Sequence, residues 1–217
     1  MKFLIAGLGS IGRRHLRNLV SLGEEDIVLY RTGRSTLPDE DLERFPTEYS
    51  LDDALAHEPD AVIVSNPTAL HLDVAIPAAK AGCHLLIEKP VSQSMQRIEE
   101  LQEAVASGGG KVLVGFQFRY HPGLLRIKDW IEEGVIGTPF SAQAWWGEYL
   151  PGWHPWEDFR RTYAAREDLG GGVALTLCHP FDYLCWTFGE VDSITARVDR
   201  LGPWDIPVED HVNTLLN

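Results

Sequence analysis

The stretch Met1-Lys2-Phe3-Leu4-Ile5-Ala6-Gly7-Leu8-Gly9-Ser10-Ile11-Gly12 decides the fold of this chain. A short apolar run leads into the spacing Gly-x-Gly-x-x-Gly, and a helical pattern follows at 11–22. In a strand–turn–helix unit the three glycines allow a tight turn, close approach of a pyrophosphate and close helix packing, and the helix N-terminus attracts the phosphate charge. A purely structural turn is the alternative, because the spacing alone is a weak signal. We predict a dinucleotide site formed by Gly7, Gly9, Ser10, Ile11 and Gly12.

Strand and helix patterns alternate downstream of this loop. Apolar runs predict strands at 27–30, 61–64, 85–87 and 112–114, and helical patterns lie at 52–57, 69–81 and 94–107. This alternation is typical of a parallel sheet covered by helices on both faces. We therefore predict an α/β fold with a doubly wound Rossmann domain at 1–120.

The pattern changes beyond residue 120. We predict a second domain at 121–217, with helices at 124–133 and from the glycines 170–172 to residue 188, and strands at 140–146, 191–201 and 212–216. So few strands leave an apolar face and a bare edge. We expect this domain to be incomplete at residue 217 and to expose an apolar patch.

The composition excludes several classes of protein. A net charge of −13 argues against binding to nucleic acid or to an anionic membrane surface, because both attract clustered Lys and Arg. The three cysteines form no Cys-x-x-Cys pair, and no apolar run approaches the roughly 18 to 20 residues of a membrane span. We predict a cytoplasmic protein with no metal site.

The residues after the second predicted strand bear on the choice of cofactor. Arg31 and Thr32 stand where an NAD-specific site usually has an acid, and Arg34 and Ser35 follow closely. Guanidinium and hydroxyl groups can hold a 2′-phosphate. We predict NADP, with NAD possible; a solvated basic loop beside 39–41 is the alternative.

Polar residues also follow the next three predicted strands. The carboxyl ends of parallel strands meet at one edge, where ligands bind. The Lys89 ammonium at this edge can orient a hydroxyl or move its proton, although a surface Lys–Glu pair is the alternative. We assign Tyr120 to the substrate, and to the cofactor Ser65, Asn66, Pro67, Thr68, His71, Glu88, Lys89 and Arg119.

In order, the motifs GxGxxG, SNPT…H, AG-x-H-LL-I-EKP, GFQFRYHP and GGG…H-x-x-D resemble the Gfo/Idh/MocA oxidoreductase family, over essentially all 217 residues. The resemblance implies a Rossmann domain and a C-terminal α/β domain with a mostly antiparallel sheet, through which members often form homo-oligomers. It also implies NAD(P)-dependent hydride transfer on sugars, polyols or nucleotide sugars. Lys89 would match the family's EKP lysine, which works beside the substrate, and His179 its helix histidine, a frequent acid/base.

The last of these motifs departs from the family pattern. Members commonly carry an Asp four residues before the histidine, where this chain has Leu175. Asp182, one helical turn after His179, can orient the imidazole instead, or it can simply cap the helix or face water. Pro180 predicts a bend at His179, and a core histidine beside a kink is the alternative.

Aromatic residues cluster at the end of the predicted strand 140–146 and in the loop that follows it. Four tryptophans fall within 145–156, and aromatic faces with nearby arginines suit a charged sugar. Trp145 and Trp146 are equally suited to a sheet core. The substrate side is predicted to comprise Lys89, Tyr120, Trp153, His154, Arg166, Thr176, His179 and Asp182.

The predicted function is that of a dehydrogenase or reductase acting on CH–OH groups of a sugar-like substrate. The alternative is a dinucleotide-binding or assembly protein without turnover of its own.

Overall fold

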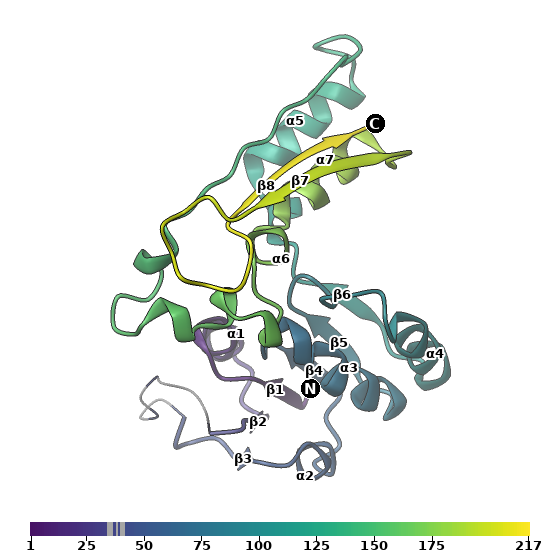
Figure 1. Cartoon of the computed structure of the whole chain (residues 1–217). Helices are drawn as coiled ribbons and strands as arrows, with labels where there is room; N and C mark the ends of the chain where they lie inside the picture. The colour runs from purple at the N-terminus through teal and green to yellow at the C-terminus, as the bar shows by residue number, and fades with distance from the viewer. Residues whose placement is uncertain (34–36, 38, 40–41) are drawn as a thin grey trace. The chain divides into compact units, whose positions relative to one another are not determined.

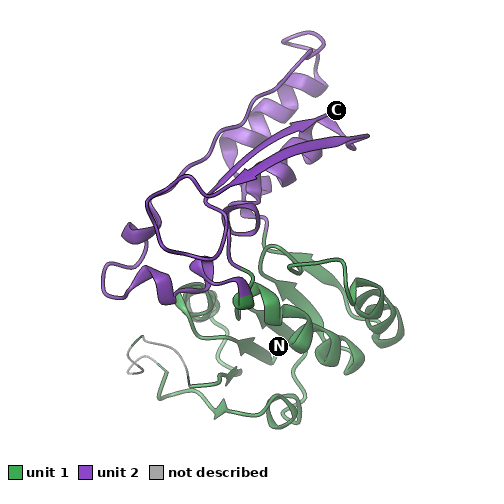
Figure 2. Cartoon of the chain, in the orientation of Figure 1, with its two compact units in different colours: residues 1–115, 168–170 green, residues 116–167, 171–217 purple. Residues whose placement is uncertain are grey.

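A computed structural model describes residues 1–33, 37, 39 and 42–217 (Figure 1). The chain forms two compact units: the first contains 1–115 and 168–170, the second 116–167 and 171–217 (Figure 2). The sequence prediction places a boundary at residue 120 and does not anticipate segment 168–170 in the first unit. That segment packs closely there, since a Cβ on Gly170 would lie 2.9 Å from Cβ of Thr68.

The first unit contains a six-stranded parallel sheet in the order β3-β2-β1-β4-β5-β6. Its strands are β1 Phe3–Ala6, β2 Ile27–Tyr30, β3 Thr47–Glu48, β4 Ala61–Val64, β5 His84–Ile87 and β6 Val112–Val114 (Figure 1). This sheet confirms the predicted α/β class. Only β3 was missed, because its two residues contain no apolar run.

Helices cover both faces of this sheet, as predicted. The helices are α1 Ser10–Ser21, α2 Leu51–Leu55, α3 His71–Lys80 and α4 Ile98–Gly108. Successive strand residues point to opposite faces. Leu4 therefore packs in the core with α2, α3 and α4, and Ile5 in the core with α1. Burial on both faces explains why these strands are continuous apolar runs.

The second unit contains three α-helices and one two-stranded antiparallel sheet among its described residues. The elements are α5 Pro122–Glu132, α6 Val173–Thr176, α7 His179–Phe188, β7 Ile194–Asp199 and β8 His211–Leu216, with short 3-10 turns at Gln117–Tyr120, Leu150–Gly152, Phe159–Arg161 and Tyr163–Ala165. A further turn, Glu167–Leu169, begins with the last residue of segment 116–167 and continues into segment 168–170 of the first unit. On the two strands, Ile194, Val198 and Leu215 are more than half exposed.

Two predictions for this unit are wrong. Segment 140–146 forms no strand: no described strand pairs with it, and Phe140 and Trp145 are almost fully exposed. The predicted long helix at 173–188 is broken after Thr176, and Pro180 stands in the first turn of α7. A proline fits there because first-turn N–H groups have no partner within the helix, whereas inside one long helix it would remove a hydrogen bond.

None of the helices that the structure describes is both long enough and apolar enough to span a membrane. The described residues also contain no cluster of three or more His, Cys, Asp or Glu placed to hold a metal ion.

Candidate active site

One continuous row of residues lies at the carboxyl edge of the first unit's sheet. The residue that follows a strand donates its backbone N–H to the last carbonyl of the neighbouring strand: Gly7 to Tyr30 (3.0 Å), Ser65 to Ala6 (2.8 Å), Glu88 to Val64 (2.9 Å) and Gly115 to Ile87 (2.8 Å). Strands β2 and β3 lie on one side of β1, and β4, β5 and β6 lie on its other side, so the strand order reverses between β1 and β4. Ligands of such sheets bind at this reversal, which is called the switch point. The predicted meeting of strand ends at one edge is confirmed for these residues.

The three glycines of the loop at this edge differ in how much space surrounds them. Gly7 has φ +96°, and a Cβ there would lie 2.5 Å from the backbone nitrogen of Asn66. A Cβ on Gly12 would overlap the carbonyl oxygen of Gly7, which also accepts a hydrogen bond from Oγ of Ser65 (2.9 Å). A Cβ on Gly9 would have no atom within 4 Å. The fold thus needs glycine at 7 and 12, and Gly9 leaves space free at the start of α1.

This space fits an anionic ligand. Gly9 is the N-cap of α1 and makes no side-chain cap, and the first turn, which begins Ser10-Ile11, carries no acidic residue. A helix N-terminus with these features favours phosphate. Beside the loop, the buried Oδ1 of Asn66 has no hydrogen-bond partner among the described residues, so it is available to a ligand. The geometry suits the pyrophosphate and ribose of a dinucleotide.

Arg31 is buried and paired, rather than part of a solvated basic loop. Its Nη1 lies 2.7 Å from Oδ1 of Asp39, and Nη2 of Arg13 lies 3.2 Å from the same oxygen. The hydrogen bond from Arg31 is the main reason that the pKa of Asp39 is held below its usual value. The sequence prediction found no acid at the end of this strand, but the fold brings the carboxylate of Asp39 into contact with Arg31. Thr32 is exposed, and Arg34 and Ser35 lie outside the described residues.

Glu88 forms a pair that the sequence prediction missed. Nε2 of His15, on α1, lies 2.7 Å from Oε1 of Glu88, and the backbone N–H of Lys89 donates to Oε2 (3.3 Å). Burial opposes ionisation of Glu88, but its contacts with His15 and Lys89 outweigh that effect and hold its pKa below the usual value. The two partners lie 73 positions apart, so no local pattern signals this pair.

His71 is buried between the loop that follows β4 and the loop that follows β5. Its side chain is almost inaccessible, with Nδ1 2.9 Å from the carbonyl oxygen of Pro90 and Nε2 2.9 Å from that of Asn66. Burial lowers the pKa of His71, although the two carbonyls oppose that shift. The nearby Thr68 is buried as well, and Pro67 precedes the turn that leads into α3. His71 therefore connects two loops, and its contact with the cofactor stays a prediction.

His179 in the second unit is buried among aromatic rings. Its ring stacks on Trp146 (centroids 5.4 Å apart, 22° between planes) and meets the edge of Phe118 at 4.8 Å. Nε2 lies 3.4 Å from Nε2 of Gln117. Its 5 % exposure agrees with the alternative of a core histidine, while the Gln117 amide supplies a polar neighbour. The sequence prediction considered Trp146 as a ring that faces the sugar or as part of a sheet core, and did not anticipate that it stacks on His179.

Asp182, which the sequence allowed to orient the imidazole, to cap the helix or to face water, pairs with Arg119. Nε and Nη2 of Arg119 approach the Asp182 carboxylate at 3.0 and 2.6 Å, and this pair raises the pKa of Arg119. A bidentate pair of this kind is strongly oriented. The Arg119 side chain is about half exposed and pairs with Asp182 within the second unit, and its contact with the cofactor stays a prediction.

The remaining predicted substrate residues belong to the second unit. Oγ1 of Thr176 donates to the carbonyl of Gly172 (2.7 Å), and His154 lies 2.7 Å from Oε1 of Glu157 and stacks on Trp156. Trp153 is partly buried, whereas Tyr120 and Arg166 are exposed.

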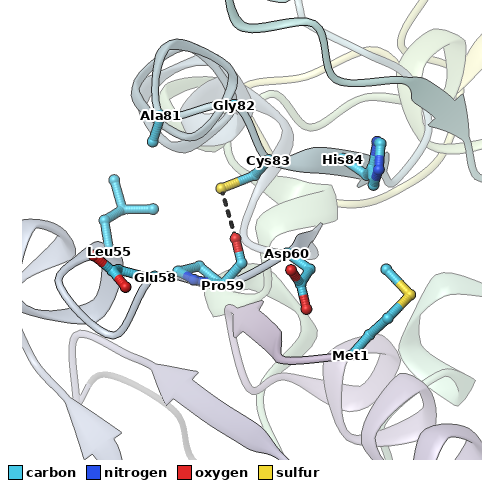
Figure 3. A pocket seen from close by; sticks show the side chains of 9 residues that line it. All are labelled: Met1, Leu55, Glu58, Pro59, Asp60, Ala81, Gly82, Cys83 and His84. Atoms are coloured by element: carbon cyan, nitrogen blue, oxygen red, sulfur yellow. Dashed lines mark hydrogen bonds between the residues drawn. The ribbon is translucent and has the colours of Figure 1, made fainter.

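A hollow of about 520 Å³ lies at the opposite edge of the first unit's sheet, where the strands begin (Figure 3). Sγ of Cys83 donates to the carbonyl of Pro59 (3.1 Å) in its wall, and burial raises the pKa of this thiol. None of the predicted site residues lines this hollow. It is therefore separate from the candidate active site.

The glycine loop at the switch point of a six-stranded parallel sheet defines a Rossmann unit of the dinucleotide-binding class. Residues 1–116 match the model of an oxidoreductase family with an NAD-binding Rossmann fold, and residues 124–217 match the GFO/IDH/MocA C-terminal domain. The chain belongs to the Gfo/Idh/MocA oxidoreductase family.

Individual proteins of known sequence or structure agree with this assignment. The chain is 31% identical over 199 residues to the oxidoreductase YrbE of Bacillus subtilis, and 28% identical over 197 residues to myo-inositol 2-dehydrogenase of Thermotoga maritima. The matched region is 89% of this chain for YrbE and 88% for myo-inositol 2-dehydrogenase, and it is 55% of the length of each of these two proteins. The WlbA dehydrogenase of Bordetella pertussis, solved with NADH and UDP-GlcNAcA, shares the fold (TM-score 0.83, 24% identity, 99% of this chain and 66% of that chain). The chain thus spans about half the length of the curated relatives it matches.

Proposed function

We propose that this chain transfers a hydride between a nicotinamide cofactor and a hydroxyl or ketone carbon of a sugar, polyol or nucleotide sugar. The observation that carries the proposal is the hydrogen-bonded row at the carboxyl edge, in which the open glycine loop and the Glu88–Pro90 segment belong to one sheet edge. The names of the relatives, which refer to myo-inositol and a UDP-linked sugar acid, support the substrate class.

The residues of the first unit suit distinct parts of the cofactor. The N–H groups at the start of α1 bind the pyrophosphate beside Gly9, and Ser65-Asn66-Pro67-Thr68 contacts the nicotinamide ribose. The nicotinamide, when bound, supplies or accepts the hydride. The chain's task is then to bind the sugar, to orient its reacting hydroxyl and to move one proton.

Lys89 and His179 are the proposed groups for that proton. As hydride leaves a CH–OH carbon, the hydroxyl proton must be taken up, and in the reverse reaction it must be returned. The Lys89 ammonium stabilises the developing alkoxide, and the His179 imidazole serves as acid or base. Tyr120, Trp153, His154, Arg166, Thr176 and Asp182 are the proposed substrate-side residues.

A substrate panel tests the proposal. The full chain is incubated with NAD or NADP and, in turn, myo-inositol, D-xylose, levoglucosan and a UDP-linked sugar acid, and absorbance of reduced cofactor is followed. We expect reduction with at least one compound. Binding of cofactor without its reduction in the presence of any of these compounds would favour a dinucleotide-binding protein without turnover. Leu175, at the position where the family commonly has an Asp, supports that alternative.

We propose NADP as the preferred cofactor. Arg31 lies at the end of β2 with its Nε buried and without a hydrogen-bond partner among the described residues, and Thr32 is next to it. NADPH is expected to bind more tightly than NADH, and Arg31→Asp should reverse the order, because a carboxylate repels the 2′-phosphate and accepts hydrogen bonds from ribose hydroxyls. Asp39→Asn, which removes the charge that now neutralises Arg31, should favour NADPH further. Equal dissociation constants in a fluorescence titration of the unmodified chain would contradict this preference.

Two further proposals concern the whole molecule. The exposed apolar side chains of β7 and β8 support pairing of two copies through this sheet, which light scattering measures. In the part of the chain that the structure describes, Cys83, Cys178 and Cys185 form no disulfide, which supports a location in the reducing cytoplasm.

A further inference from the structure

Two histidines from different helices of the first unit contact the residues on either side of Lys89. His15, on α1, contacts the carboxylate of Glu88, and His71, at the start of α3, contacts the carbonyl of Pro90. We infer that His15 and His71 are positioning residues that together fix the segment Glu88–Pro90 and so determine where the Lys89 ammonium acts. This inference rests on the proposed function, in which Lys89 acts on the substrate hydroxyl.

The His15 contact holds the Glu88 side chain in one orientation. Both side chains are largely buried, with 18% and 14% exposure, and a charge-assisted hydrogen bond is strong and directional in such surroundings. The second carboxylate oxygen faces the Lys89 N–H at 3.3 Å. A Cβ on Gly115 would lie 3.1 Å from that oxygen, so the residue that follows β6 also packs against the Glu88 carboxylate. Glu88 is thus committed to contacts within the protein, which favours positioning over the predicted contact with the cofactor.

The His71 contact fixes the other side of Lys89. The ring reaches the carbonyl of Pro90 with Nδ1 and that of Asn66 with Nε2, each at 2.9 Å. It therefore joins the loop after β4, which is proposed to meet the ribose, to the loop after β5, which carries Lys89. Since a buried ring cannot exchange these partners for water, the two loops keep a fixed spacing.

The two contacts have a common consequence for catalysis. A lysine side chain is long and has many rotamers, so its ammonium is placed accurately only when the backbone beneath it is held. Loss of placement by about 1 Å can slow a reaction on the order of a hundredfold. Loss of either histidine should therefore reduce kcat and leave KM and cofactor affinity nearly unchanged.

Paired substitutions separate positioning from mere packing. His15→Leu and His71→Leu remove the hydrogen bonds, whereas His15→Gln keeps a donor near Nε2 and His71→Asn keeps one near Nδ1. His57→Leu is the matched control, because His57 forms a similar pair with Glu48 (2.9 Å) in the same unit but contacts neither Glu88 nor Pro90. Two quantities are measured in the full chain: amide hydrogen exchange of the peptide that contains 87–91, and kcat with the best substrate of the panel.

We expect each leucine variant to raise the exchange rate of the Lys89 amide about tenfold and to lower kcat about tenfold or more. The Gln and Asn variants should recover most of kcat, His57→Leu should change neither quantity, and neither leucine substitution should lower kcat further in Lys89→Met. His15 is less buried than His71, so its variants carry the test if His71→Leu does not fold. Unchanged exchange and unchanged kcat in the leucine variants would overturn the positioning role, even where Lys89→Met is inactive. Full turnover in Lys89→Met would instead overturn the catalytic assignment of Lys89, and the inference with it.

Discussion

Replacement of Lys89 by Met is expected to lower kcat on the order of a hundredfold or more while the dissociation constant of the cofactor changes little. The ammonium is proposed to stabilise the alkoxide and move its proton, and general acid–base groups contribute typically about 10²- to 10⁴-fold. Met keeps the length and apolar character of the Lys stem, so the change removes mainly the charge and the donor. His179→Ala should reduce kcat similarly.

The measurement is steady-state turnover with the best substrate, together with a fluorescence titration of cofactor. Lys80→Met serves as the control, since Lys80 is an exposed lysine of the same unit paired with Glu100 (3.1 Å). It should keep the activity of the unmodified chain. If the Lys89 and His179 variants both kept near-normal kcat, these two residues would not be the catalytic groups.

The second large effect concerns two glycines of one loop. Gly12→Ala should destabilise the fold by about 3 kcal/mol or more, because its Cβ would overlap the carbonyl of Gly7 and α1 would have to move away from β1. Gly9→Ala should leave the melting temperature almost unchanged, since its Cβ meets no protein atom and its φ of −73° suits any residue. The same methyl projects into the proposed pyrophosphate site, so cofactor affinity should fall on the order of a hundredfold, or about 2.7 kcal/mol.

Thermal unfolding and cofactor titration of both variants check this separation. Gly23→Ala is a useful reference: its Cβ also meets no atom within 4 Å and it lies beyond the far end of α1, but its φ of +85° gives the strain expected of a left-handed residue. It should cost some stability without changing cofactor affinity. Tight cofactor binding by Gly9→Ala would place the pyrophosphate elsewhere.

The first unit was predictable from sequence because local signals and the fold agree there. Each long strand is a continuous apolar run, and glycines mark the turns, so β1, β2, β4, β5 and β6 lie where they were predicted. The roles of Gly7 and Gly12 followed from the same argument. Strand β3 was not predictable, since its pairing with β2 depends on the sheet already formed.

Side-chain partners at the candidate site were harder to predict. Asp39 reaches Arg31, and His15 reaches Glu88, only because distant segments meet at the sheet edge. In the second unit, Asp182 stands one turn from His179 on α7, and helical spacing alone left open whether the two interact. Arg119, a more strongly oriented partner, takes the carboxylate instead.

Transfer of deuterium tests the central claim most directly. The full chain is incubated with oxidised cofactor and a substrate of the panel that carries deuterium on the reacting carbon, and the reduced cofactor is analysed by mass spectrometry. Hydride transfer predicts reduced cofactor one mass unit heavier, with the deuterium at C4 of the nicotinamide, and slower formation of this product in Gly9→Ala at a cofactor concentration that just saturates the unmodified chain. Cofactor that binds normally but acquires no deuterium from any substrate of the panel would contradict the account.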